Sequence, residues 1–169
     1  MTADTTLRRT PLYEAHVQAG AKLVDFAGWE MPVQYKGLID EHRAVRTAAG
    51  LFDCSHMGEF WIAGPGALAF VQSFTPNDVS KLALGRIHYS ALLTQEGTFI
   101  DDLLVYRMGE EEFMLVVNAS NIAGDFAWVE SLPRPAGVTL VNRSDEFALL
   151  ALQGPRSVAI LQPLTATPL

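Results

Sequence analysis

Two adjacent carboxylates at the start of an apolar segment are the side chains best suited to chemistry. Asp101 and Asp102 lie within residues 99–106, which read Phe-Ile-Asp-Asp-Leu-Leu-Val-Tyr. Successive side chains of a strand point to opposite faces, so Asp101 shares a face with Leu103 and Asp102 shares the other with Leu104. At least one carboxylate therefore has apolar neighbours, where a charge is costly without hydrogen bonds or a positive partner. The residues alone favour an Asp that caps the preceding turn, which is common, and leave a functional site as the alternative.

Cys54 and His56, in the run Asp-Cys-Ser-His, raise the possibility of a nucleophile or a metal site. A metal site needs several His, Cys or carboxylate ligands at repeated spacings, and one Cys beside one His gives no such pattern. We therefore interpret Cys54 as a packed residue and predict no metal site.

Three further side chains could contact a flat, polar ligand. Trp29 and Tyr89 could stack on such a ligand, although large aromatic residues more often belong to a core. Asn118 ends a predicted strand, where its amide could hydrogen-bond a heterocycle or cap the following helix. The residues alone leave both alternatives open for each position.

Charge and composition exclude several classes of protein. The 169 residues include 12 Lys plus Arg against 19 Asp plus Glu, which gives a net charge of −7. Nucleic-acid binders usually carry clustered Lys and Arg that contact phosphates, so this class is excluded. The 49% hydrophobic fraction predicts a sizeable core, and the single cysteine excludes an intrachain disulfide. No apolar run approaches the ~20 residues of a membrane span, and the N-terminus lacks a signal-peptide pattern. We therefore expect a cytoplasmic protein without nucleic-acid or membrane partners.

The elements that must position these residues are short helices and strands. The spacing of apolar residues, Gly and Pro predicts helices over 11–19, 38–49, 67–74, 123–132 and 157–161. Strands are predicted over 22–27, 32–35, 59–63, 88–93, 99–106, 113–118, 138–141 and 147–152, the last of them buried. Short turns between residues 88 and 118 favour an antiparallel meander. The predicted fold class is α+β, with antiparallel sheets and short helices.

A strand, a Gly-Pro pair and a helix occur twice in this order. The pairs Gly64-Pro65 and Gly154-Pro155 are 90 residues apart, and a Glu-Phe dipeptide precedes each. This spacing predicts a duplicated α+β unit. Fewer residues follow the second pair, so we expect a truncated second unit that lacks its closing strands and exposes a sheet edge.

Five motifs that follow one another along the chain identify a family more specifically than any single motif does. They are Thr-Pro-Leu-Tyr-Glu at 10–14, Asp-Phe-Ala-Gly-Trp-Glu-Met-Pro at 25–32, Glu-His-Arg-Ala-Val-Arg at 41–46, Gly-Leu-Phe-Asp-Cys-Ser-His-Met-Gly at 50–58 and Ile-Asp-Asp-Leu at 100–103. In this order the sequence resembles the T-protein family, the aminomethyltransferases of the glycine cleavage system. The resemblance covers essentially the whole chain, but only about the N-terminal half of a family member.

The resemblance implies an enzyme of glycine catabolism and one-carbon metabolism. Family members accept an aminomethyl group from the dihydrolipoyl arm of the lipoylated H-protein, release ammonia and form methylenetetrahydrofolate from tetrahydrofolate. In that family the first Asp of the pair, here Asp101, contacts the pterin and orients the attacking folate nitrogen, while Asp102 is expected to be structural. Met57, Tyr89, Val116 and Asn118 match positions that line the folate pocket.

The resemblance also implies the domain organisation, a duplicated folate-binding arrangement. Residues 1–57 with 138–169 are expected to form an incomplete, discontinuous first folate-binding domain, and residues 58–137 the second domain. Family members draw a further Glu and Arg from beyond this length, so we expect this chain alone to bind folate weakly and to be nearly inactive.

Two related functions are alternatives. One is a non-catalytic folate-binding module related to iron–sulfur cluster assembly factors, whose cysteine motif would lie beyond Leu169. The other is the folate domain of a flavin amine dehydrogenase, which would follow a long nucleotide-binding region, whereas here Met1 lies just ahead of the first motif. The set of motifs favours the aminomethyltransferase.

Overall fold

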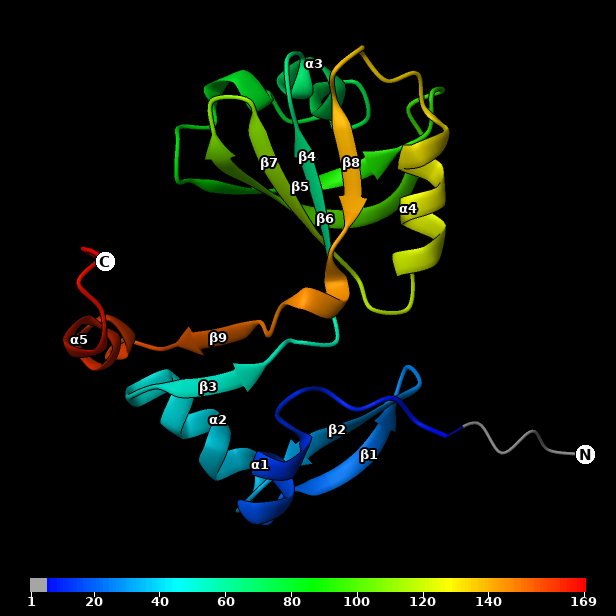
Figure 1. Cartoon of the computed structure of the whole chain (residues 1–169). Helices are drawn as coiled ribbons and strands as arrows, with labels where there is room; N and C mark the ends of the chain where they lie inside the picture. The colour runs from blue at the N-terminus through cyan, green and yellow to red at the C-terminus, as the bar shows by residue number, and fades with distance from the viewer. Residues whose placement is uncertain (1–5) are drawn as a thin grey trace, which may run out of the picture. The chain divides into compact units, whose positions relative to one another are not determined.

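The computed structural model describes residues 6–169, which divide into two compact units (Figure 1). One unit contains the described residues up to His56 together with Ala148–Leu169, and the other is the segment Met57–Phe147. All strands paired within the described residues are antiparallel. None of the helices between residues 6 and 169 is long and apolar enough to cross a membrane. The predicted fold class, α+β with antiparallel sheets and short helices, is confirmed.

The continuous unit is built on a five-stranded sheet of order β5-β6-β7-β4-β8. Its elements are β4 (Gly58–Ala63), α3 (Ala67–Gln72), η1 (Val79–Lys81), β5 (Ile87–Leu93), β6 (Phe99–Gly109), β7 (Glu112–Val117), α4 (Ile122–Ser131), β8 (Thr139–Asn142) and η2 (Ser144–Glu146). β5, β6 and β7 are joined by short turns and pair in sequence order, which confirms the predicted meander.

One face of this sheet forms the core. Apolar side chains of β4, β6 and β7 alternate into it, and they meet α3 and α4, which cover the same face. Phe60 of β4 packs edge-on against Phe126 of α4, with ring centroids 5.1 Å apart. Phe60, Val105 and Leu115 are fully buried, each stabilising the fold by about 1.5–3 kcal/mol. The core therefore holds β6, the strand that carries the two adjacent aspartates, under a helical layer.

The discontinuous unit is built on two two-stranded sheets. It contains α1 (Tyr13–Gln18), β1 (Lys22–Phe26), β2 (Trp29–Gln34), α2 (Leu38–Thr47), β3 (Gly50–Asp53), β9 (Leu150–Gln153), α5 (Ser157–Leu161) and η3 (Gln162–Leu164). β1 and β2 form a hairpin, and among residues 6–169 β3 pairs with β9 alone. Leu51 and Leu150 of that two-stranded sheet are 62% and 47% exposed. Among the described residues each strand of this sheet has one unpaired edge, as expected for a second copy that lacks its closing strands.

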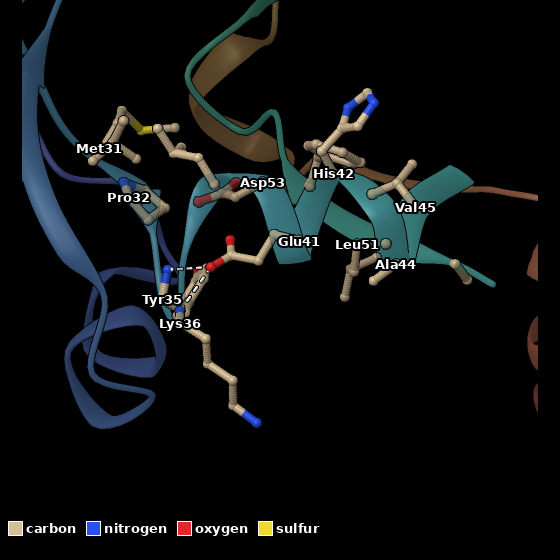
Figure 2. A pocket seen from close by; sticks show the side chains of 15 residues that line it. Met31, Pro32, Tyr35, Lys36, Glu41, His42, Ala44, Val45, Leu51 and Asp53 are labelled. Carbon is tan, nitrogen blue, oxygen red and sulfur yellow. Dashed lines mark hydrogen bonds between the residues drawn. The ribbon is translucent and has the colours of Figure 1, made fainter. Parts of the chain in front are cut away.

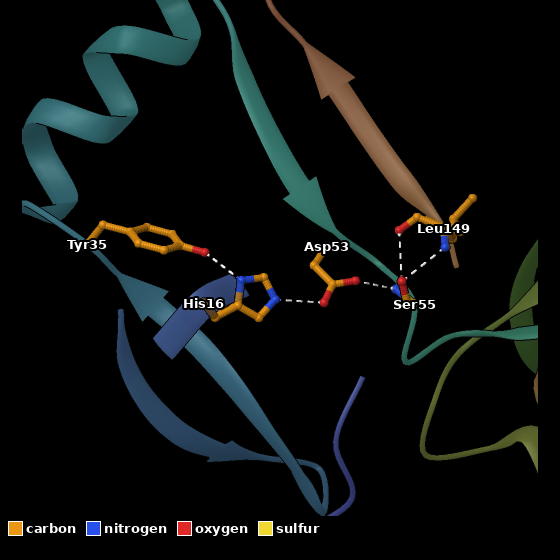
Figure 3. Close-up of polar contacts among 5 residues, drawn as sticks. All are labelled: His16, Tyr35, Asp53, Ser55 and Leu149. Atoms are coloured by element: carbon orange, nitrogen blue, oxygen red, sulfur yellow. Dashed lines mark hydrogen bonds and ion pairs between the residues drawn. The ribbon is translucent and has the colours of Figure 1, made fainter. Parts of the chain in front are cut away.

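A partly buried chain of polar contacts links four parts of this unit (Figure 3). The Tyr35 hydroxyl lies 2.8 Å from His16 Nδ1, and His16 Nε2 lies 2.8 Å from Asp53 Oδ2. The backbone N–H of Ser55 donates to Asp53 Oδ1, and the Ser55 hydroxyl contacts the backbone of Leu149. Burial favours the neutral form of Asp53, but hydrogen bonds from Ser55 and His16 outweigh it and lower its pKa. Polar contacts therefore tie α1 and β2 to the segments around β3 and β9.

The repeated strand, Gly-Pro pair and helix are confirmed. β4 leads through Gly64 into α3, and β9 leads through Gly154 into α5. Both glycines have left-handed φ angles, +116° and +121°, which L side chains rarely adopt. The preceding Glu-Phe match is not structural, because Glu146 ends the 3-10 turn η2 whereas Glu59 lies inside β4.

Two sequence predictions are wrong. The strand predicted over 147–152 and expected to be buried is instead β9, which begins at Leu150 and contains no buried residue, since among the described strands it pairs with β3 alone. Residues 138–147, assigned to the first domain, belong to the continuous unit because β8 pairs with β4 and Phe147 stacks on Trp61 with ring centroids 6.0 Å apart.

Candidate functional site

The two adjacent carboxylates lie near the start of β6 and occupy opposite faces of the sheet. Asp101 alternates with Leu103 and Val105 of the core and is itself only 7% exposed. Asp102 lies on the other face and is partly exposed. The predicted alternation is confirmed, and it places Asp101 on the side covered by α4.

Hydrogen bonds from three donors hold the Asp101 carboxylate. Its Oδ1 accepts from the backbone N–H of Asp102 at 2.9 Å and from Asn118 Nδ2 at 3.0 Å. Its Oδ2 accepts from Asn121 Nδ2 at 2.8 Å. Burial favours the neutral form, but the hydrogen bonds from Asn121 and Asn118 outweigh it and lower the pKa of Asp101. Asp101 is therefore an ionised carboxylate with its hydrogen bonds satisfied.

Asp102 contacts two of the residues predicted to line a ligand pocket. The Tyr89 hydroxyl donates to Asp102 Oδ2, and Asn118 Nδ2 lies 3.1 Å from Asp102 Oδ1. Ala91 pairs with Asp102, so Tyr89, two residues earlier, shares its face of the sheet. Tyr89 is 64% exposed, which leaves its ring open to a flat ligand. Asp102 was expected to be structural, yet it is the carboxylate that shares a face with this exposed ring.

Neither capping alternative describes these residues. The turn before β6 is closed by Thr94 and Thr98, whose hydroxyl oxygens lie 2.7 Å apart, and not by an aspartate. The N-cap of α4 is Asn121, whereas the Asn118 side chain donates to the carboxylates. The Asn118 side chain therefore donates hydrogen bonds to the carboxylates of both aspartates.

Met57 and Val116 lie on the elements next to this cluster. Met57 directly precedes Gly58, which pairs with Val117 of β7, so Met57 and Asn118 lie at the same end of the sheet. Val116 pairs with Leu104 and therefore occupies the face of Tyr89, but it is only 1% exposed. The structure thus joins Asp101 and Asn118 by a hydrogen bond, connects Tyr89 to them through Asp102, and leaves Met57 and Val116 at the margin.

Sequence reasoning missed two members of the cluster, Asn121 and Asp125. Asn121 donates to Asp101, and Asp125, one helical turn later, is 2% exposed and interacts with the same carboxyl group. A possible signal was their i, i+4 spacing directly after the strand that ends near Asn118, which puts both on one helix face. Which face that would be depends on how α4 packs on the sheet.

The other candidates from the sequence, His56, Cys54 and Trp29, lie outside this cluster and are packed among neighbouring side chains. His56 packs edge-on against Phe26, with ring centroids 5.8 Å apart, and burial lowers the pKa of its imidazole. Burial and the nearby Asp53 raise the pKa of the Cys54 thiol, which disfavours the reactive thiolate. Trp29 is 7% exposed and carries the Arg8 guanidinium over its ring. Among residues 6–169 no group of His, Cys, Asp and Glu is arranged to hold a metal ion.

A cavity of about 560 Å³ lies in the discontinuous unit (Figure 2). Its walls are mainly apolar side chains of β2, α2 and β3, among them Met31, Val45 and Leu51. At one edge Glu41 Oε1 accepts from the backbone N–H groups of residues 35–37, at 2.7–2.9 Å, which fixes the loop between β2 and α2. None of the predicted site residues lines this cavity.

Glu59 on β4 provides a test of how burial affects stability. It is 2% exposed, its Oε2 has no hydrogen-bond partner among the described residues, and burial raises its pKa to about 7. The folded state then keeps a proton that the unfolded chain releases near pH 4.5, so the free energy of unfolding should fall by about 3 kcal/mol as pH rises from 4.5 to 7.

Glu59→Gln should therefore stabilise the chain at pH 8 by roughly 2 kcal/mol and have little effect at pH 4.5. Urea unfolding at both pH values measures this difference. Glu96→Gln, at an exposed position in the same unit, is the matched control and should change neither value. An equal effect of Glu59→Gln at both pH values would contradict the raised pKa.

Comparison with known proteins extends this picture. The model of the family described as the GCVT N-terminal domain matches residues 12–169. The chain belongs to this family. It is 57% identical over 162 residues to an aminomethyltransferase of Deinococcus deserti, covering 96% of this chain and 45% of that protein. An aminomethyltransferase of Thermus thermophilus is 52% identical over 159 residues, covering 94% of this chain and 46% of that protein. The chain spans about 45% of the length of these curated relatives.

Solved structures agree with the fold. The crystal structure of glycine cleavage system aminomethyltransferase T from Bartonella henselae matches with a TM-score of 0.86 and 42% identity, over 93% of this chain and 43% of that one. Heterotetrameric sarcosine oxidase from Corynebacterium sp. U-96 matches with a TM-score of 0.52 and 14% identity, over 95% of this chain and 68% of that one. The second likeness concerns the fold alone.

Proposed function

We propose that this GCVT-family chain supplies the pterin-binding half of a tetrahydrofolate-dependent aminomethyltransferase of the glycine cleavage system. The observation that carries the proposal is 57% identity, over nearly the whole chain, to a protein named aminomethyltransferase. The cluster formed by Asp102, Asn118 and Tyr89 supports it, because it combines an exposed aromatic ring with polar groups suited to a heterocycle. The proposed partner is the lipoylated H-protein, which would deliver the aminomethyl group.

In the proposed reaction the carbon–nitrogen bond of the aminomethyl group breaks, ammonia leaves, and the carbon forms bonds to two nitrogens of tetrahydrofolate while its bond to the lipoyl sulfur breaks. Positive charge develops on the carbon as ammonia departs. A fixed carboxylate near this carbon can stabilise the charge and hold the attacking nitrogen in line. The site then acts through position and electrostatics more than through strong base chemistry.

The two carboxylates divide these tasks in our proposal. The resemblance assigns the pterin contact to Asp101, but its oxygens already accept from three donors on the core side of the sheet. Asp102 is partly exposed and shares its face with Tyr89. We infer that Asp102 reaches the folate and that Asp101 orients the Asn118 amide beneath it.

The test is a calorimetric titration of the 169-residue chain with tetrahydrofolate, combined with thermal unfolding. Saturable binding that raises the melting temperature supports the proposal, since a ligand that binds only the folded state stabilises it. Tyr89→Ala should weaken this binding by at least about fivefold, because a stacking contact is worth about 1 kcal/mol or more. Tyr13→Ala, at a partly exposed position in the other unit, is the control variant. Absence of binding by a cooperatively folded chain would overturn the proposed pterin site.

A further inference from the structure

Asp125 is a buried acid for which the proposed folate site gives no role. It lies on α4 one turn after Asn121, and side chains at this spacing project from one helix face. Asn121 donates to Asp101 Oδ2, and the Asp125 carboxyl interacts with the same group. Asp125 is 2% exposed, and its Oδ2 has no hydrogen-bond partner among residues 6–169.

Two carboxylates in contact share a proton, because ionising both would place like charges side by side in a buried setting. Three donors already stabilise the charge on Asp101, so the proton resides on Asp125. Burial, the hydrogen bond with Asp101 and the charges of Asp101 and Asp102 together raise the pKa of Asp125 to about 7.

We propose that Asp125 is a positioning residue: its protonated carboxyl donates a hydrogen bond to Asp101 and thereby orients the Asn118 amide toward the ligand. Asp101 Oδ1, Asp102 Oδ1 and the Asp102 backbone oxygen all lie 3.0–3.3 Å from Asn118 Nδ2. The amide nitrogen is thus directed to the carboxylates, and the amide oxygen is directed away from them. The inference rests on the proposed function for the identity of the ligand.

This arrangement selects for a hydrogen-bond donor on the ligand. The Asn118 oxygen can only accept, so it matches an N–H edge such as that of the pterin amino-pyrimidinone ring. When Asp125 loses its proton, Asp101 loses one donor and gains a negative neighbour. Weaker orientation of Asn118 should then reduce folate affinity as pH rises through 7.

Protonation is tested first without ligand, on the 169-residue chain labelled with carbon-13 at the aspartate side-chain carboxyl. One aspartate should titrate near pH 7, and the side-chain amide resonances of Asn118 should move with the same midpoint. Asp125→Asn should abolish both changes, because its amide still donates to Asp101 but cannot ionise. Asp40→Asn, an exposed control, should preserve them. Titration of every aspartate below about pH 5, or an Asn118 amide that does not respond, overturns the inference.

Folate affinity gives the second readout. Affinity of the parent chain should fall about tenfold between pH 6 and 8.5, whereas Asp125→Asn should keep the affinity measured at pH 6 across this range. Asp125→Ala, which lacks the donor, should bind about tenfold more weakly at every pH. A pH-independent affinity of the parent chain overturns the inference. If no variant binds folate, the proposed function fails for this chain, while the titrations of Asp125 and Asn118 still decide whether the carboxyl pair positions the amide.

Discussion

Gly64→Ala should lower the free energy of unfolding by at least about 3 kcal/mol, a large effect for the addition of one methyl group. Gly64 connects β4 to α3 with a φ of +116°, a conformation that costs any L side chain energy. A Cβ atom there would also overlap the carbonyl oxygen of Gly137, which is backbone and cannot move aside like a flexible side chain. Conformational strain and steric overlap therefore act together.

The matched control is Gly124→Ala, within α4. A Cβ atom at Gly124 meets nothing within 4 Å, and alanine is a better helix former than glycine. This substitution should stabilise the chain by about 0.5–1 kcal/mol. Urea unfolding of both variants should show a lower free energy of unfolding for Gly64→Ala and a higher one for Gly124→Ala, although both replace glycine with alanine. A Gly64→Ala variant as stable as the parent chain would contradict both the left-handed conformation of Gly64 and its close approach to Gly137.

The fold was predictable where local signals agreed with long-range pairing. Period-two alternation located β6 and β7, and the short turns between them predicted the meander. The assignment of residues 138–147 failed because β8 pairs with β4, a strand more than 70 residues earlier. Neither periodicity nor turn residues encode the choice of a distant partner. The same limit explains β9, whose apolar run suggests burial although, within the part of the chain that the structure describes, β3 is its one partner.

The candidate site was predictable in its residue types but not in its connections. Alternation along β6 separates Asp101 from Asp102, and the structure confirms this separation. Sequence could not show which face is covered by α4, and that face determines which carboxylate is open to a ligand. Asn121 and Asp125 were missed for the same reason, since their roles depend on the side of the helix that packs against β6.

Asp102→Asn and Asp101→Asn should have different consequences, and this difference tests the proposed division of tasks. Asp102 accepts from Tyr89 and Asn118 on the partly exposed face. Asparagine keeps one acceptor there, and the Tyr89 hydroxyl can rotate to accept from the new amide. Stability should therefore change little. Loss of the negative charge should weaken tetrahydrofolate binding at least about tenfold, the usual scale for a charge-assisted contact.

Asp101→Asn should instead destabilise the chain by about 2–4 kcal/mol, because the new amide nitrogen must face a donor nitrogen of Asn118 or Asn121 inside a buried cluster. Folate affinity should fall only to the extent that this substitution displaces the Asn118 side chain. Urea unfolding and calorimetric titration of both variants separate the two effects, with Asp40→Asn as an exposed control. The opposite result, a stable Asp101→Asn that fails to bind and an Asp102→Asn that binds normally, would return the pterin contact to Asp101. Stability and affinity thus report separately on two carboxylates that are adjacent in the sequence but lie on opposite faces of one strand.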